Sequence, residues 1–236
     1  TLTVTPNDGT VNGTVDTVSI SITAVNDAPS LGGTPADDIA TEDVATAIDL
    51  SAYNVADAEG DTLTLTLAVD RGTVASTDGN GTTAGVTVAM SGTASMTLAG
   101  SAADLNSYLS DTSKITYTTA LNDTTAATLT VTPNDGTVNG TVDTVGISIT
   151  AVNDAPTVTG VPTDITVTED LASNFDLSAV TFAEVDGDNL TVTLAASTGT
   201  FAATSGGSVA VGGSGTGSLT LTGSAADINT YLDTVS

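Results

Sequence analysis

The residues best suited to chemistry are carboxylates at alternate positions of a loop that contains a glycine. The loop at 57–61 has this pattern, and the loop at 184–188 repeats it. The six acidic residues are Asp57, Glu59, Asp61, Glu184, Asp186 and Asp188. Oxygens arranged around a tight turn suit a hard cation such as Ca²⁺, which takes roughly six to eight oxygen ligands. We therefore predict calcium sites here, with a solvated acidic surface as the alternative.

Further oxygen ligands lie in two other groups. The first is an Asn-Asp pair inside the stretch V-N-D-A-P, which occurs at 25–29 and again at 152–156. The second is a Glu-Asp pair that follows each of these stretches. Together the two groups contain Asn26, Asp27, Glu42, Asp43, Asn153, Asp154, Glu169 and Asp170. We expect the three groups of one repeat to converge at one end of a domain, where Ca²⁺ would stiffen the junction with its neighbour.

Charge and composition exclude several classes of protein. The 236 residues include 28 acidic and 2 basic residues, so the formal net charge is −26. Such a chain cannot bind nucleic acids by neutralising phosphates, and anionic membrane surfaces would repel it. Its self-repulsion would be relieved in surroundings rich in salt or calcium. Because Cys and His are both absent, disulfides, thiolate chemistry, His-based catalysis and the usual zinc sites are excluded.

A long internal repeat is the main feature of the sequence. Residues 1–29 and 128–156 are identical except that Ser19 corresponds to Gly146, and the offset is 127 positions. This period is too long for one unit of a solenoid. It suits an independent domain that is strung in a tandem array.

A second motif fixes the extent of the repeats. The stretch at 101–109 recurs at 224–232 with an offset of only 123 positions, so the loops of the later copy are four residues shorter. We predict three parts: 1–27 as the last strands of a preceding or partner-completed repeat, 28–154 as a complete repeat, and 155–236 as an incomplete repeat that lacks its last strands.

Short alternating stretches must position the acidic loops. In the stretch at 63–69, for example, Leu and Val alternate with polar or small residues, as in a strand with one buried face. The stretch at 101–109 breaks this pattern, and Ser101 could cap a short helix there. We predict an all-β fold of tandem Ig-like β-sandwich domains, each with about seven to nine strands and one short helix.

Four motifs follow one another in order: V-N-D-A-P, T-E-D, D-x-E-G-D-x-L-T-L-T-L and S-A-A-D-L-N-x-Y-L. In this combination the chain resembles the bacterial cadherin-like repeats of giant secreted adhesins, including those of the RTX type. The resemblance implies an extracellular, calcium-binding array of β-sandwiches that extends a binding tip from the cell.

Individual residues match parts of the family pattern. The Asn-Asp pairs resemble part of the cadherin linker, Glu42 resembles an early glutamate ligand, and the acidic residues of the 57–61 loop resemble D-x-D ligands. Animal cadherins also have an acidic residue before the Asn-Asp pair and an Asn after it, where this chain has Ala24-Val25 and Ala28. We therefore expect about one or two ions per junction, fewer than a full linker would bind.

The function we expect is that of a secreted, cell-surface spacer or adhesive repeat, with neighbouring repeats or copies of the chain as partners. One alternative is a glycan- or ice-binding module that uses the row Thr62, Thr64 and Thr66. Enzymatic activity is not expected, because the chain is repetitive, has one Lys and lacks His and Cys. A run of about 18 apolar residues is also absent, so we expect no membrane insertion.

A second alternative is a filament-forming subunit. Residues 155–236 lack counterparts of the strands expected near 115–117, 129–131 and 145–152, and residues 1–24 copy two of these three. The head of one molecule could therefore complete the tail of the next by donor-strand addition. The other interpretation is that the sequence is a segment of a longer chain.

Overall fold

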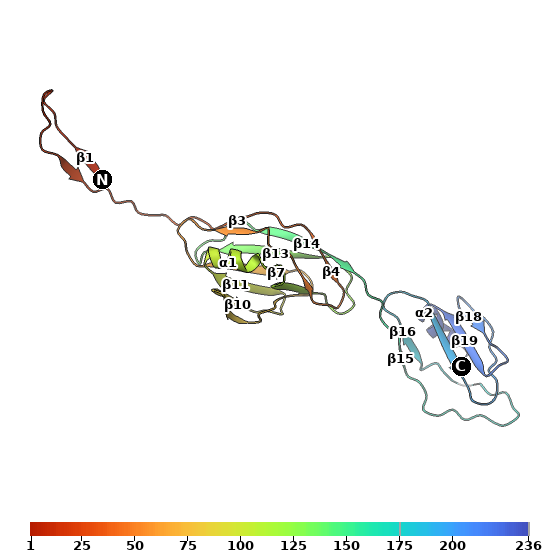
Figure 1. Cartoon of the computed structure of the whole chain (residues 1–236). Helices are drawn as coiled ribbons and strands as arrows, with labels where there is room; N and C mark the ends of the chain where they lie inside the picture. Colours follow the sequence, from red (N-terminus) through yellow and green to blue (C-terminus); the bar gives the residue numbers. More distant parts are fainter. Residues whose placement is uncertain (175, 236) are drawn as a thin grey trace. The chain divides into compact units, whose positions relative to one another are not determined.

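The computed structural model describes residues 1–174 and 176–235, and most of its regular structure is β-sheet (Figure 1). The chain divides into two compact units, Thr1–Thr150 and Ala151–Ser236, here called unit 1 and unit 2. Each unit contains several sheets and one short helix. The predicted all-β class with sandwich-like domains is confirmed.

A seven-stranded sheet forms most of unit 1. Its strands, in spatial order, are β4 (Asp38–Thr41), β14 (Asp143–Thr150), β13 (Ala127–Asn134), β7 (Leu63–Val69), β11 (Ser95–Gly100), β10 (Val86–Ala89) and β9 (Gly81–Thr83). All neighbours are antiparallel except β4 and β14, which run parallel. The carboxyl ends of β4 and β14 therefore lie at the same end of the sandwich, with Thr41 opposite Thr150.

Strand β7 shows why the sequence forms this sheet. Its Leu and Val side chains are buried, while the residues between them are half-buried on the opposite face. Such alternation places one face of the strand on the core and leaves the other face nearer to water. Strands β11 and β13 flank β7, so the backbone of β7 is paired on both edges.

A smaller sheet covers the core from the other side. It consists of β5 (Thr46–Ala47), β12 (Ile115–Thr118) and β8 (Thr73–Ser76), and β3 (Ser30–Gly32) pairs separately with β6 (Asn54–Ala56). Between residues 28 and 154, all of which the structure describes, there are twelve strands. The prediction of seven to nine was wrong because several strands are only two to four residues long.

The predicted helix is present as α1 (Ala102–Leu109). The Ser101 side chain accepts a hydrogen bond from the Asp104 backbone N–H at 3.2 Å, which caps the helix as expected. Leu105, Tyr108 and Leu109 are buried on its inner face. Asn106 fixes the helix to β6, since its side chain accepts from the Val55 N–H at 2.7 Å and donates to the Val55 carbonyl at 2.9 Å.

The first residues of unit 1 form a separate two-stranded hairpin. It consists of β1 (Leu2–Val4) and β2 (Asp16–Val18), and the register places Leu2 opposite Val18. The homologous pair in β13 and β14 is Leu129 opposite Val145, so the repeated sequence adopts the same pairing twice.

Unit 2 contains two sheets and one helix. Its elements are β15 (Thr157–Thr159), β16 (Thr181–Ala183), β17 (Leu190–Ala195), β18 (Ala210–Gly212), β19 (Ser218–Gly223) and α2 (Ala225–Val235). Strands β17, β19 and β18 form one sheet, and β15 pairs with β16. Asn229 binds both backbone groups of Phe182 at 2.9 Å, as Asn106 binds Val55 in unit 1.

Candidate metal centre

The Asn-Asp pair at 26–27 lies against the acidic loop, as predicted. The backbone N–H of Asp27 donates to Glu59 Oε2 at 3.2 Å. The Asn26 side-chain amide donates to Asp135 Oδ2 at 2.8 Å. We call this part of the sandwich the leading end, because here the chain joins the complete repeat.

Within the acidic loop, Asp57 serves first as a structural residue. Its Oδ1 accepts hydrogen bonds from the backbone N–H groups of Gly60 at 2.8 Å and Asp61 at 3.0 Å. Gly60 has a φ of 77°, which supplies the tight turn. The second oxygen of Asp57, Oδ2, is buried and has no hydrogen-bond partner among the described residues. Burial of this oxygen without a partner destabilises the folded chain unless a cation binds it.

The same arrangement recurs at the start of unit 2. The Asp154 backbone N–H donates to Asp186 Oδ2 at 2.7 Å, as Asp27 does to Glu59. The two oxygens of Glu184 accept from the N–H groups of Asp186 at 3.1 Å and Asp188 at 2.6 Å. Asn153, like Asn26, donates its side-chain amide to the carbonyl of the next residue at 3.2 Å. The repeated sequence thus builds the same acidic turn in both units.

Glu42 and Asp43 form a second candidate site, immediately after β4. Glu42 is only 2% exposed, and one of its oxygens lies within 4.8 Å of one from Asp43, close enough to hold a metal ion together. Asp43 is fixed by its backbone N–H, which donates to Thr119 Oγ1 at 2.8 Å, and by its Oδ1, which accepts from the Asn122 N–H at 3.0 Å. Glu42 is buried and Asp43 is exposed, so this acidic pair combines one buried and one solvent-facing carboxylate.

The expected convergence of three groups at one end of a repeat is wrong. The Glu42 backbone N–H donates to the Thr150 carbonyl at 3.0 Å, at the carboxyl end of β14. The leading end instead lies beside the start of β14, where a Cβ on Gly140 would come within 1.9 Å of the Pro29 carbonyl oxygen. The eight residues of β14 therefore separate the two sites by roughly 25 Å. We call the Glu42 side the trailing end.

Glu169 and Asp170 have a different environment from their equivalents in unit 1. Both are exposed, although Asp170 has a φ of 57° and Asp43 one of 58°, so the turn itself is conserved between the copies. The described part of unit 2 has no strand equivalent to β14. In unit 1, by contrast, Glu42 lies beside the end of β14, where its backbone N–H donates to the Thr150 carbonyl.

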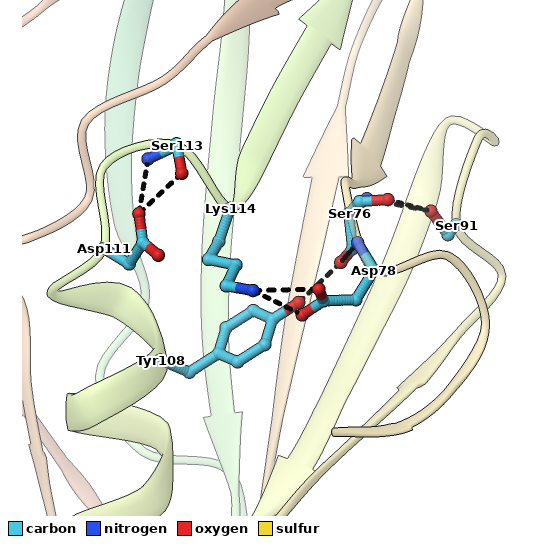
Figure 2. A network of polar contacts seen from close by, with 7 residues as sticks. All are labelled: Ser76, Asp78, Ser91, Tyr108, Asp111, Ser113 and Lys114. Atoms are coloured by element: carbon cyan, nitrogen blue, oxygen red, sulfur yellow. Dashed lines mark hydrogen bonds and ion pairs between the residues drawn. The ribbon is translucent and has the colours of Figure 1, made fainter. Parts of the chain in front are cut away.

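The two basic residues of the chain are paired with carboxylates that are not among the predicted ligands. Arg71 lies 3.8 Å from Asp123, and Lys114 Nζ donates to both oxygens of Asp78 at 2.8 and 2.9 Å. Figure 2 shows the Lys114–Asp78 pair beside Tyr108, within a network that also contains Ser76. Hydrogen bonding to Lys114 lowers the pKa of Asp78, and the same bond raises the pKa of Lys114.

Asp135 is a site residue that the sequence analysis missed. It is 8% exposed, and its Oδ1 accepts from the N–H groups of Thr137 and Val138 at 2.7 Å each. The hydrogen bond from the Val138 backbone lowers the pKa of Asp135 most, and the hydrogen bond from the Asn26 side chain lowers it further. The lowered pKa favours the ionised carboxylate, which is the form that binds a cation. An N-D-G sequence such as that at 134–136 is typical of a turn, and nothing in the neighbouring residues shows that this turn lies against Asn26.

Comparison with known proteins gives only weak likenesses. No family model matches the chain, and no curated protein matches it. Domains 4–9 of the surface layer protein SbsC are 12% identical with a TM-score of 0.25, over 92% of this chain and 29% of that one. The C-terminal domain of the AgI/II polypeptide BspA from Streptococcus agalactiae is 10% identical with a TM-score of 0.25, over 88% of this chain and 86% of that one.

The chain thus spans less than a third of the length of the first of these structures. Neither helix in the described part of the chain is long and apolar enough to cross a membrane.

Proposed function

We propose that this chain is an extracellular, calcium-binding structural repeat, which acts as a spacer in a large cell-surface adhesin or fibre. The tandem repetition, the net charge of −26 and the acidic sites at the ends of the sandwich support this function. Cadherin-like repeats of the RTX type remain the family that the motifs resemble.

The observation that carries the proposal is the burial of Glu42 beside Asp43. A carboxylate that is 2% exposed loses most of its hydration, and a second negative charge within 4.8 Å adds repulsion. The two basic side chains of the protein contact other carboxylates. A divalent cation would neutralise both charges, and carboxylate oxygens are the ligands that Ca²⁺ prefers.

The leading end provides the second group of ligands. There Asp57 Oδ2 is buried, and Asn26, Glu59 and Asp135 are held nearby by the hydrogen bonds described above. The equivalent turn at 184–188 would supply unit 2 with ligands of its own. Ions held by the residues around each V-N-D-A-P stretch would restrict the motion of successive repeats, which is what a spacer requires.

The proposal is tested most sharply by Glu42→Gln. In a chelator this variant should be at least as stable as the unsubstituted chain, because it removes a buried charge that repels Asp43. In calcium it should be less stable, because one ligand of the ion is lost. Thermal melting in both conditions measures this reversal, and calorimetric titration should show calcium affinity reduced at least about tenfold.

The matched control is Asp233→Asn, which also removes one negative charge, from an exposed position on α2. It should leave the calcium response unchanged. If Glu42→Gln responds to calcium as strongly as Asp233→Asn does, Glu42 and Asp43 do not bind the ion.

A further inference from the structure

The two acidic turns of the chain differ in how their first residue is bound. Each turn begins with a half-buried carboxylate, Asp57 in unit 1 and Glu184 in unit 2. The backbone bends in the same way in both, since Gly60 has a φ of 77° and Gly187 one of 82°. In both turns the first carboxylate accepts hydrogen bonds from two backbone N–H groups, but it receives them on different oxygens.

Asp57 receives both hydrogen bonds on a single oxygen. Its Oδ1 accepts from the N–H groups of Gly60 and Asp61, while its Oδ2 is buried and has no hydrogen-bond partner among the described residues. Folding has therefore already removed the water from Oδ2 without replacing it. A cation that binds this oxygen restores the interaction that burial took away.

Glu184 receives the two hydrogen bonds on separate oxygens. Its Oε1 accepts from the Asp186 N–H at 3.1 Å, and its Oε2 accepts from the Asp188 N–H at 2.6 Å. The additional methylene group of Glu lets its carboxylate reach further along the turn, so that each oxygen contacts a different N–H group. A cation bound to either oxygen would have to share it with the positive end of an N–H dipole.

The third residues of the two turns have matching contacts. Glu59 accepts a hydrogen bond from the Asp27 N–H at 3.2 Å. Asp186 accepts one from the Asp154 N–H at 2.7 Å. The fifth residue is Asp in both turns. Within the turns, the number of oxygens left for an ion therefore differs at the first residue.

We propose that the first residue sets the calcium affinity of each acidic turn, so that the turn at 57–61 binds Ca²⁺ more tightly than the turn at 184–188. Ca²⁺ is held by oxygen ligands, and Asp57 offers one that has no other partner, whereas both oxygens of Glu184 are shared. This ranking of the two turns rests on the proposed calcium function and deepens it. The two turns would fill at different calcium concentrations.

Nuclear magnetic resonance of the full chain, titrated with calcium alone, reads each turn separately. Gly60 and Gly187 each provide one amide signal from within their turn. The Gly60 signal should reach its midpoint at a calcium concentration at least about tenfold lower than the Gly187 signal. Equal midpoints, or an earlier change at Gly187, would overturn the proposal.

Exchange of the first residues tests the cause of this difference. Glu184→Asp should lower the midpoint of the Gly187 signal about tenfold, and Asp57→Glu should raise that of the Gly60 signal about tenfold. Ala58→Val gives the first turn the second residue of the other turn and should move neither midpoint. The two exchanges act in opposite directions, so one remains decisive if the other prevents folding. Midpoints that do not move would contradict the role of the first residue.

The exchanges leave Glu42 and Asp43 unchanged, so failure of the ranking can be told apart from failure of the proposed function. If Glu42→Gln shows the expected reversal of stability but the exchanges move neither glycine signal, only the ranking is wrong. If calcium changes neither the melting temperature nor any amide signal of the unsubstituted chain, both are wrong.

Discussion

Glu42 and Glu169 show how much the surroundings of one residue type decide its chemistry. The two glutamates occupy equivalent positions in a T-E-D motif, yet Glu42 is buried and Glu169 is exposed. Strand β14 lies beside the first and has no described equivalent beside the second. The sequence identifies both as candidate ligands, because residue type and spacing are local properties. The burial of Glu42, however, depends on β14, which lies about a hundred positions away in the sequence.

Asp57 also shows that residue type and spacing do not predict the surroundings of a candidate ligand. The alternation of carboxylates at 57, 59 and 61 predicted three ligands that point to one ion. In the structure Asp57 Oδ1 is bound by the N–H groups of Gly60 and Asp61, so half of this carboxylate shapes the turn. Spacing therefore predicted a tight acidic turn, but not the direction of each oxygen.

The ion pair of Lys114 and Asp78 leads to a prediction about pH. The pKa of Asp78 is lowered in the folded chain, so the pair stabilises the fold at neutral pH, and this contribution is lost as the pH falls through that lowered pKa. Lys114→Met should lower the melting temperature by a few degrees at pH 7 and have little effect in strong acid.

Arg71→Met is the control for this prediction. It removes the same charge from a looser and more exposed contact, 3.8 Å from Asp123. Melting curves of both variants over the acidic range should converge as Asp78 becomes protonated. A constant difference between them at all values of pH would show that the ion pair is not the cause.

At the scale of elements, the local predictions succeeded better than the non-local ones. The short helix and the alternating strand β7 were both predicted, because helix capping and hydrophobic periodicity depend on residues that are close in the sequence. The parallel pairing of β4 with β14 was not predicted, since it joins segments far apart in the sequence. This pairing is what places Glu42 at the trailing end.

The recurring Asn of the S-A-A-D-L-N motif provides a test of how the helix is attached. Asn106 satisfies both backbone groups of Val55, which is buried. Asn106→Ala would leave these groups without that partner and should lower the free energy of unfolding by about 1–3 kcal/mol. Ser107→Ala, at an exposed position of the same helix, should have little effect. Chemical denaturation measures both, and equal values would contradict the role of Asn106.

Strands β7 and β17 allow a matched comparison of packing. Leu67→Ala removes a fully buried side chain and should destabilise unit 1 by about 2–5 kcal/mol. Leu194→Ala, at the equivalent position, should cost unit 2 less because that side chain is only half-buried. Native-state hydrogen exchange at the amides of β7 and β17 would report each unit separately. A larger loss in unit 2 would contradict the half-buried state of Leu194.

At the scale of the whole molecule, the large negative charge makes the stability of the fold depend on bound cations. A chain with a formal charge of −26 gains stability from any cation that binds only its folded form. The sequence predicted this dependence from composition alone. It could not predict which carboxylates share a site, because the acidic groups of one repeat divide between the two ends of its sandwich.

The most direct test of the account is calcium binding by the unsubstituted chain. Calorimetric titration after treatment with a chelator should show saturable calcium binding. The melting temperature should rise with calcium, by an amount equivalent to about 2.7 kcal/mol when free calcium is a hundredfold above the dissociation constant. An equal ionic strength of sodium chloride should not reproduce this rise. Absence of binding heat together with identical melting temperatures in calcium and in chelator would contradict the account.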